Sequence, residues 1–156
     1  MDAHLSTYQY GSPRQPNEGL RLGVARHVPR GVRHEDWQRK NYFDLWLPLV
    51  APASELVSQF KHGRITFMAF SRHYLSQMKA AESRQVIELL ATVSLFQSIS
   101  IGCFCEDESH CHRSLLRELI LKEAKKRASR FSRRSNSQPD ESARFASPVC
   151  FAHNQE

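Results

Sequence analysis

Hydrophobic and polar positions alternate along the chain with two different periods, and these periods predict where strands and helices lie. Three short segments carry the strand pattern, which is either a two-residue alternation or a high content of strand-forming residues. They cover residues 5–10, 19–26 and 98–104. The first is the weakest, and the last is the clearest, because Ile99 and Ile101 alternate there with small polar residues.

Helical periodicity follows the second strand and returns after the third. The predicted helices cover about 34–40, 54–61, 67–78, 83–96 and 113–130. Thr66 is expected to cap the third of these helices, and Ser54 is a better cap than Ala53 for the second. One face of the third helix, which we expect in the core, carries Phe67, Phe70, Tyr74 and Met78. Residues 41–50 are densely apolar but contain Pro48, so we expect a loop packed on the core.

Strands separated by helical segments, followed by a final strand–loop–helix unit, predict the α/β fold class. We expect a compact sandwich in which a small, mainly parallel sheet is flanked by helices. A length of 156 residues with 40% hydrophobic residues fits one globular domain. Residues 1–132 are assigned to this domain, and the polar segment 133–156 is expected to be a disordered tail.

The formal net charge of +6 comes almost entirely from one segment near the C-terminus. Residues 112–134 carry nine Lys and Arg against two Glu, whereas residues 1–111 are nearly neutral. This distribution argues against a protein that coats nucleic acid, so nucleic acid is not the expected partner. The sequence has no apolar run of membrane-spanning length and no signal-peptide pattern, which predicts a cytoplasmic protein without a membrane partner.

The most informative chemistry lies between the last predicted strand and the last predicted helix, over residues 103–113. Open α/β sheets bind ligands at this position, and the free N–H groups of a helix start favour an anion. Arg113 adds a fork of donors there, and His112 supplies a group that titrates near neutral pH. Arg26 and Arg30 bracket a turn after the second strand, and they converge with this segment if the two strands are neighbours.

The leading hypothesis is therefore a pocket for a small anionic ligand, either a nucleotide or a phosphorylated metabolite. Arg26, Arg30 and Arg113 are the expected anion-binding groups. Cys111 is expected to line the pocket, and His112 is the candidate catalytic residue. The hypothesis requires no cofactor, assigns no reaction, and leaves open whether the protein is an enzyme.

The cysteines before the last helix suggest metal binding or a reactive thiol, because four cysteines do not make a disulfide scaffold in a chain of this length. In the alternative hypothesis, Cys105, Cys111 and His112 bind a metal ion, zinc or iron. Cys103 is a further candidate ligand, but it shares the strand parity of Ile99 and Ile101 and is therefore expected to pack inward. A reactive thiolate at Cys105 or Cys111 is a further alternative, which the acidic run 106–108 opposes.

A third alternative is a non-enzymatic interaction module that acts through the basic end of the last helix, residues 122–134. Positive charge near the C-terminus of a helix is also favoured by the helix dipole, so a solvated helix end explains the same residues. The pattern leaves the oligomeric state and the role of Cys150 open.

The chain resembles the domain-of-unknown-function family 488, which includes the YeaO-like proteins of bacteria, because it carries several motifs of that family in the same order. The resemblance spans about residues 5–126 and rests on Arg26, Pro29, Arg30 and Gly31, the helix start at Pro52–Leu56, the stripe of Phe70, Tyr74 and Met78, and the unit Cys111-His112-Arg113. It implies a compact Rossmann-like α/β domain with a pocket at Arg26, Arg30 and the Cys-His-Arg unit. YeaO-like relatives lack the cysteines but keep a histidine at the position of His112, which implies that His112 is the important member.

Overall fold

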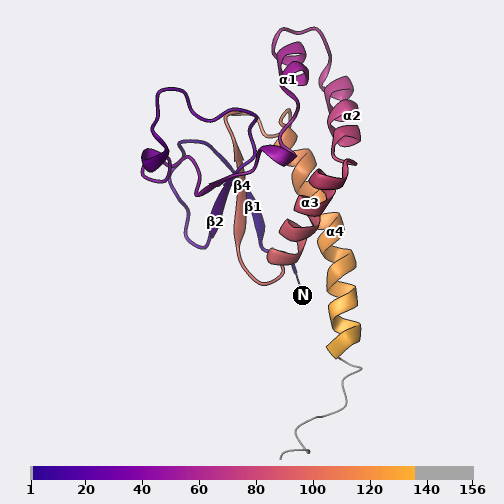
Figure 1. Cartoon of the computed structure of the whole chain (residues 1–156). Helices are drawn as coiled ribbons and strands as arrows, with labels where there is room; N and C mark the ends of the chain where they lie inside the picture. The colour runs from indigo at the N-terminus through magenta and orange to yellow at the C-terminus, as the bar shows by residue number, and fades with distance from the viewer. Residues whose placement is uncertain (1, 136–156) are drawn as a thin grey trace, which may run out of the picture.

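A small parallel sheet forms the centre of the structure, a computed structural model that describes residues 2–135 (Figure 1). Its strands are β1 (Leu5–Gln9), β2 (Leu20–Gly23), β3 (Leu45–Trp46) and β4 (Ile99–Cys103). The helices are α1 (Ser54–Lys61), α2 (Phe67–Gln77), α3 (Ala81–Val93) and α4 (His112–Ser135), with short 3-10 helices η1 (His34–Asp36) and η2 (Pro48–Val50). These elements confirm the predicted α/β class.

The strands are ordered β1-β4-β2-β3, and every pairing among them is parallel. The central position of β4 pairs Ile101 with Thr7 on one side and with Leu22 on the other. All five residues of β4 are buried, as expected for a strand covered on both faces. Parallel strands end at the same edge of a sheet, so the segments that follow β1, β2 and β4 are neighbours.

The main hydrophobic core lies between one face of the sheet and the helices (Figure 1). Its most deeply buried side chains include Leu22, Ile99 and Ile101 from the strands, and Tyr74, Leu116 and Ile120 from the helices. The predicted stripe of α2 is confirmed at Phe70, Tyr74 and Met78, whereas Phe67 is only partly buried. Figure 1 shows α1 and α2 as an arm above the edge at which the strands end.

The other face of the sheet is organised by Arg21, a fully buried arginine. Its guanidinium donates to both carboxylate oxygens of Glu18, at 3.0 and 2.9 Å, and to three backbone carbonyls of the surrounding loops. The guanidinium also lies 4.2 Å from the centroid of the Tyr8 ring. This ring covers Gly102, where an added Cβ would come within 2.2 Å of it. The buried charge is thus fully compensated, and loops rather than helices cover this face.

The segment between β2 and α1 differs from its prediction. Only His34–Asp36 of the expected polar helix is helical, as a 3-10 turn. The expected loop 41–50 contains β3, because the Asp44 N–H donates to the Arg21 carbonyl and the Leu47 N–H donates to the Gly23 carbonyl. A strand of two residues is too short to produce an alternating pattern, so only the tertiary structure defines it.

The two predicted helix caps have different outcomes. Thr66 caps α2 as expected, since its hydroxyl accepts a backbone N–H at 3.2 Å. Ser54 does not cap α1, because it is the first helical residue and Ala53 holds the cap position without a side-chain bond. The Ala53 N–H donates instead to the side-chain oxygen of Gln77, the last residue of α2, at 3.0 Å. A residue of α2 thus provides a hydrogen-bond acceptor at the start of α1, where no local side chain does.

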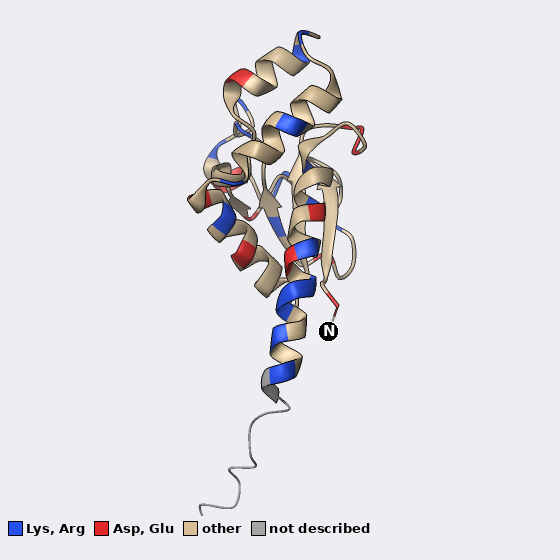
Figure 2. Cartoon of the chain, turned by 90° about the vertical axis from the view of Figure 1, so that its right-hand side faces the viewer, with Lys and Arg blue, Asp and Glu red and all other residues tan. Residues whose placement is uncertain are grey.

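The last two helices are displaced from their predicted bounds. Helix α3 begins at Ala81 rather than at Ser83, whose hydroxyl is used inside the fold to donate to the Leu49 carbonyl at 2.7 Å. Helix α4 continues to Ser135, so the expected domain boundary at 132 falls within a helix; the rest of the predicted tail, 136–156, lies outside the described residues. Figure 2 shows Lys and Arg gathered on the half of α4 that projects below the sheet. Among the helices of residues 2–135, none is long and apolar enough to cross a membrane.

We predict that Glu18→Ala lowers the free energy of unfolding by about 3–5 kcal/mol, because it leaves the buried Arg21 charge without its counterion. Urea unfolding followed by circular dichroism measures the change. The matched control is Glu35→Ala, which removes an exposed ion pair with Arg33 and is expected to cost less than about 1 kcal/mol. Equal losses in the two variants would contradict the role given to Arg21.

Candidate functional site

The candidate site lies at the edge where the strands end, below the α1–α2 arm. Cys103 is the last residue of β4, and His112 is the first residue of α4. The connecting loop turns back just before the helix, because the Cys111 N–H donates to the Glu108 carbonyl at 3.2 Å and the Ser114 hydroxyl donates to the Cys111 carbonyl at 2.7 Å. This turn lets two adjacent side chains, Cys111 and His112, face the same interior point.

His112 is held in one orientation by the end of β2. Its Nε2 lies 2.8 Å from the backbone carbonyl oxygen of Val24, which can only accept a hydrogen bond. Nε2 therefore carries the proton, and the lone pair of Nδ1 points at two sulfur atoms. These are Sγ of Cys103 at 3.9 Å and Sγ of Cys111 at 3.8 Å. Burial lowers the pKa of His112, which keeps the ring neutral.

Cys103, Cys111 and His112 form a compact cluster of possible metal ligands, which we call the Cys-Cys-His cluster. All three residues are buried, and their ligand atoms lie within 4.8 Å of one another. Cys105, which the sequence favoured as a ligand, is exposed and does not belong to this set, although its Sγ lies 3.8 Å from Sγ of Cys103. Cys103 is buried as predicted, and it also faces the histidine, whereas the sequence analysis ranked it behind Cys105 as a ligand.

The thiols beside the cluster influence one another strongly. Hydrogen bonds from the thiols of Cys103 and Cys111 lower the pKa of Cys105 well below its usual range, and the positive charge of Arg113 acts in the same direction. Donating these bonds raises the pKa of Cys103 and of Cys111, and burial adds to the effect. Thiolate character is therefore concentrated on the exposed sulfur of Cys105.

The acidic run beside the thiols is engaged elsewhere. Glu108 accepts from the Thr7 hydroxyl at 2.7 Å, and Asp107 accepts from the Ser109 hydroxyl and contacts His110 at 2.6 Å. The Ser109 and His110 bonds lower the pKa of Asp107 to about 2. These contacts secure the loop to the middle of β1 and to itself.

The four basic groups expected to converge on one anion do not line one cavity. Arg26 and His112 line the same cavity at the strand ends, but the Arg26 Nε donates to the Pro52 carbonyl at 2.8 Å, and a terminal nitrogen donates to the Ala51 carbonyl at 2.9 Å. Arg30 is exposed and lies outside this cavity. The expectation that the four basic groups converge on one anion is therefore wrong, whereas anion binding by some of them stays a prediction.

Arg113 is the clearest departure from the expected anion site. It is buried, and its guanidinium donates to the Tyr8 carbonyl at 3.0 Å and to the Glu106 carbonyl at 3.4 Å. Its Nε is one of the few buried side-chain nitrogens without a partner in the part of the chain that the structure describes. Arg113 thus ties the loop and the start of α4 to β1, which a sequence pattern cannot distinguish from ligand binding.

The fold and this site define an α/β domain with a thiol–imidazole cluster at the carboxyl edge of a parallel sheet. The chain belongs to the domain-of-unknown-function family 488. The family model described as "Active DUF488-N3 subclade" matches residues 5–124, which confirms the resemblance drawn from the motifs. Comparison with curated proteins returned no match, and neither did comparison with solved structures.

We predict that His112 of the reduced, metal-free protein is neutral at pH 7 and protonated at Nε2. Long-range proton–nitrogen NMR correlation distinguishes the two tautomers, and the His112→Gln variant assigns the signal. His110 provides an internal comparison, since its Nδ1 faces the carboxylate of Asp107 and should carry the proton there. A charged His112 ring, or a proton on its Nδ1, would contradict the orientation described above.

A second prediction separates the two arginines. Arg113→Ala should lower the free energy of unfolding by roughly 2–3 kcal/mol, because it removes charged hydrogen bonds to buried carbonyls. Arg30→Ala should change it by less than about 0.5 kcal/mol, as exposed substitutions usually do. Denaturant titrations of both variants measure the difference, and an Arg113→Ala variant as stable as the native protein would refute the structural role.

Proposed function

We propose that the protein binds one transition-metal ion, in the first place zinc, through the Cys-Cys-His cluster. The observation that carries this proposal is the Nδ1 lone pair of His112, which the Val24 carbonyl directs at two buried thiols. Metal-binding histidines commonly donate their other ring N–H to a carbonyl or carboxylate in this way. Two thiolates and one imidazole form a soft donor set, and such sets occur in zinc proteins.

The distances support a shared ion. Zinc binds sulfur at about 2.3 Å and nitrogen at about 2.0–2.1 Å in tetrahedral geometry, which places a sulfur and a nitrogen ligand about 3.6 Å apart. The two sulfur–nitrogen distances in the cluster are 3.9 and 3.8 Å, so shifts of a few tenths of an ångström would complete the geometry. The ligand atoms of all three residues lie within 4.8 Å of one another, which is close to the roughly 3.8 Å expected for two thiolates on one zinc ion.

The metal proposal differs in one residue from the ligand set expected from the sequence, since Cys103 takes the place given to Cys105. An anion site for a nucleotide or a phosphorylated metabolite stays a second candidate, favoured by Arg26 at the cavity beside His112. Free thiols fit a reducing compartment, so a cytoplasmic location remains part of the proposal.

The proposal predicts one equivalent of zinc per chain in protein purified without an affinity tag and under reducing conditions. Elemental analysis measures the content, and competition with a chromophoric chelator measures the affinity. Cys111→Ser and His112→Ala each remove a ligand, so they should weaken binding by more than about 100-fold, beyond the 10–100-fold typical of residues behind the ligands. Bound zinc should also raise the melting temperature, and a chelator should reverse this.

The matched control is Cys150→Ser, which changes the fourth cysteine of the chain, a residue outside the described range. Zinc binding should survive this change. Absence of stoichiometric metal in the native protein, or full affinity in Cys111→Ser, would reject the proposal.

A further inference from the structure

A small cavity opens directly beside the Cys-Cys-His cluster. Its volume is about 180 Å³, and all three residues of the cluster line it. Structural zinc sites are closed by four protein ligands, whereas catalytic sites keep three and leave the fourth position to water or substrate. Three buried ligands that border a cavity match the second arrangement.

The walls of the cavity are mostly carbon. Apolar side chains come from α1, α2, the end of β4 and the segment before α1, and they are Pro52, Val57, Phe60, Phe70 and Phe104. The two rings Phe60 and Phe70 lie 5.0 Å apart between centroids and are tilted by 41°. Aromatic walls of this kind favour a flat apolar ring, because ring pairs prefer tilted or offset contacts at such distances.

Apart from the three thiols, the ionisable side chains that line the cavity are basic. Arg26 and Lys61 line it, with His27 and His110, and no acidic residue does. The carbonyls of Ala51 and Pro52 occupy Nε and one terminal nitrogen of Arg26 and fix its guanidinium at the wall. The remaining positive potential favours a ligand with an anionic group and disfavours a cationic one.

The size of the cavity limits what can enter. Pockets for drug-sized ligands measure roughly 300–1,000 Å³, so about 180 Å³ suits a ligand built on a single ring. A whole nucleotide exceeds this space, which narrows the class of anion expected from the sequence.

We propose that this cavity is the ligand site of the metal centre and binds a small organic anion with one flat ring. The anionic group takes the open metal position beside Arg26 and Lys61, and the ring lies against Phe60 and Phe70. This inference rests on the proposed metal site. Cys105, which is exposed, also lines the cavity, and its Sγ lies 3.8 Å from Sγ of Cys103. In this proposal the ligand, and not the Cys105 thiol, takes the fourth position.

Cobalt substitution of the full chain tests the two proposals separately. Elemental analysis first establishes whether one metal ion is bound, and failure at this step overturns the metal site itself. Benzoate is then titrated while the visible d–d bands of cobalt are recorded. We expect benzoate to shift these bands saturably, and a cobalt-loaded protein whose spectrum does not respond would overturn the ligand site alone.

Two further probes test the class of ligand. Acetate carries the carboxylate without the ring, and it should bind at least about tenfold more weakly than benzoate. Benzylamine carries the ring with a cation, and it should leave the spectrum unchanged. Equal affinity for acetate would overturn the ring site, and binding of benzylamine as tight as that of benzoate would overturn the preference for anions.

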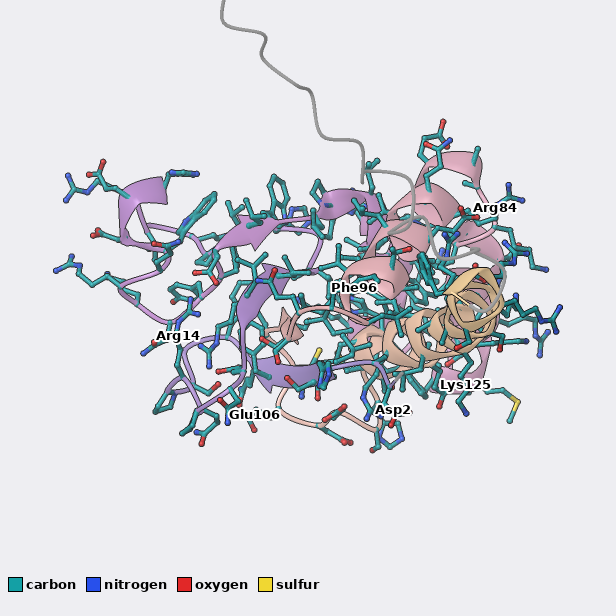
Figure 3. The ribbon with its side chains drawn as sticks, turned by 90° about the horizontal axis from the view of Figure 1, so that it is seen from below. Asp2, Arg14, Arg84, Phe96, Glu106 and Lys125 are labelled. Atoms are coloured by element: carbon teal, nitrogen blue, oxygen red, sulfur yellow. The ribbon has the colours of Figure 1, made fainter. Side chains whose placement is uncertain are left out.

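Substitutions at the walls locate the site. Phe60→Ala should weaken benzoate about three- to tenfold without loss of cobalt, because Phe60 contacts the ring and not the metal. The control is Phe96→Ala, since Phe96 is exposed, does not line the cavity and lies between α3 and β4 (Figure 3). If Phe60→Ala unfolds, Lys61→Gln at the exposed rim should weaken benzoate with Lys40→Gln as its control. Unchanged binding in the wall variant that folds would overturn the location.

Cys105 is tested in the same way. Cys105→Ser should keep the cobalt spectrum of the native protein and its response to benzoate. Loss of thiolate-to-cobalt charge-transfer intensity in this variant would show that Cys105 closes the site, and would overturn an open fourth position.

Discussion

Two adjacent residues at the start of α4 bind the strands on either side of β4, and the site depends on this constraint. His112 hydrogen-bonds to the Val24 carbonyl just after β2, and Arg113 donates to the Tyr8 carbonyl in β1. The sheet order β1-β4-β2 places the end of β4 between these two anchors. Cys103, the last residue of β4, is thereby held next to Nδ1 of His112. The turn before α4 places the sulfur of Cys111 next to the same nitrogen.

The anchors in turn rely on the other face of the sheet. Arg21 lies over the Tyr8 ring, and that ring covers Gly102. These contacts fix β1, which provides the Tyr8 carbonyl to Arg113, from the face of the sheet that the loops cover. A buried charge with a complete set of partners is costly to disturb, which favours one arrangement of the surrounding loops. The loop face and the start of α4 are thus linked through β1.

The sequence carried enough information for the α/β class, the three longer strands and the stripe of α2, because these depend on periodicity within one element. The sequence also singled out the segment between β4 and α4 that carries the candidate cluster, since a strand end followed by a helix start is a local pattern. The partners of Arg113 and Arg26 could not be predicted, because both arginines donate to backbone carbonyls, which every residue has and which no sequence pattern marks. Cys103 was visible near the end of a predicted strand, and its place at the carboxyl edge of the sheet was the signal that could have identified it as a ligand.

The contacts of the 104–111 loop bear on the kind of metal centre that is proposed. Arg113 holds the Glu106 carbonyl, Thr7 donates to Glu108, and the Cys111 N–H closes the turn, so protein groups already secure the loop that carries Cys111, one of the three proposed ligands. Structural zinc sites occur where a loop cannot fold without the ion. A loop that folds on its own contacts does not need an ion to close it, which leaves a bound metal free to exchange its fourth ligand.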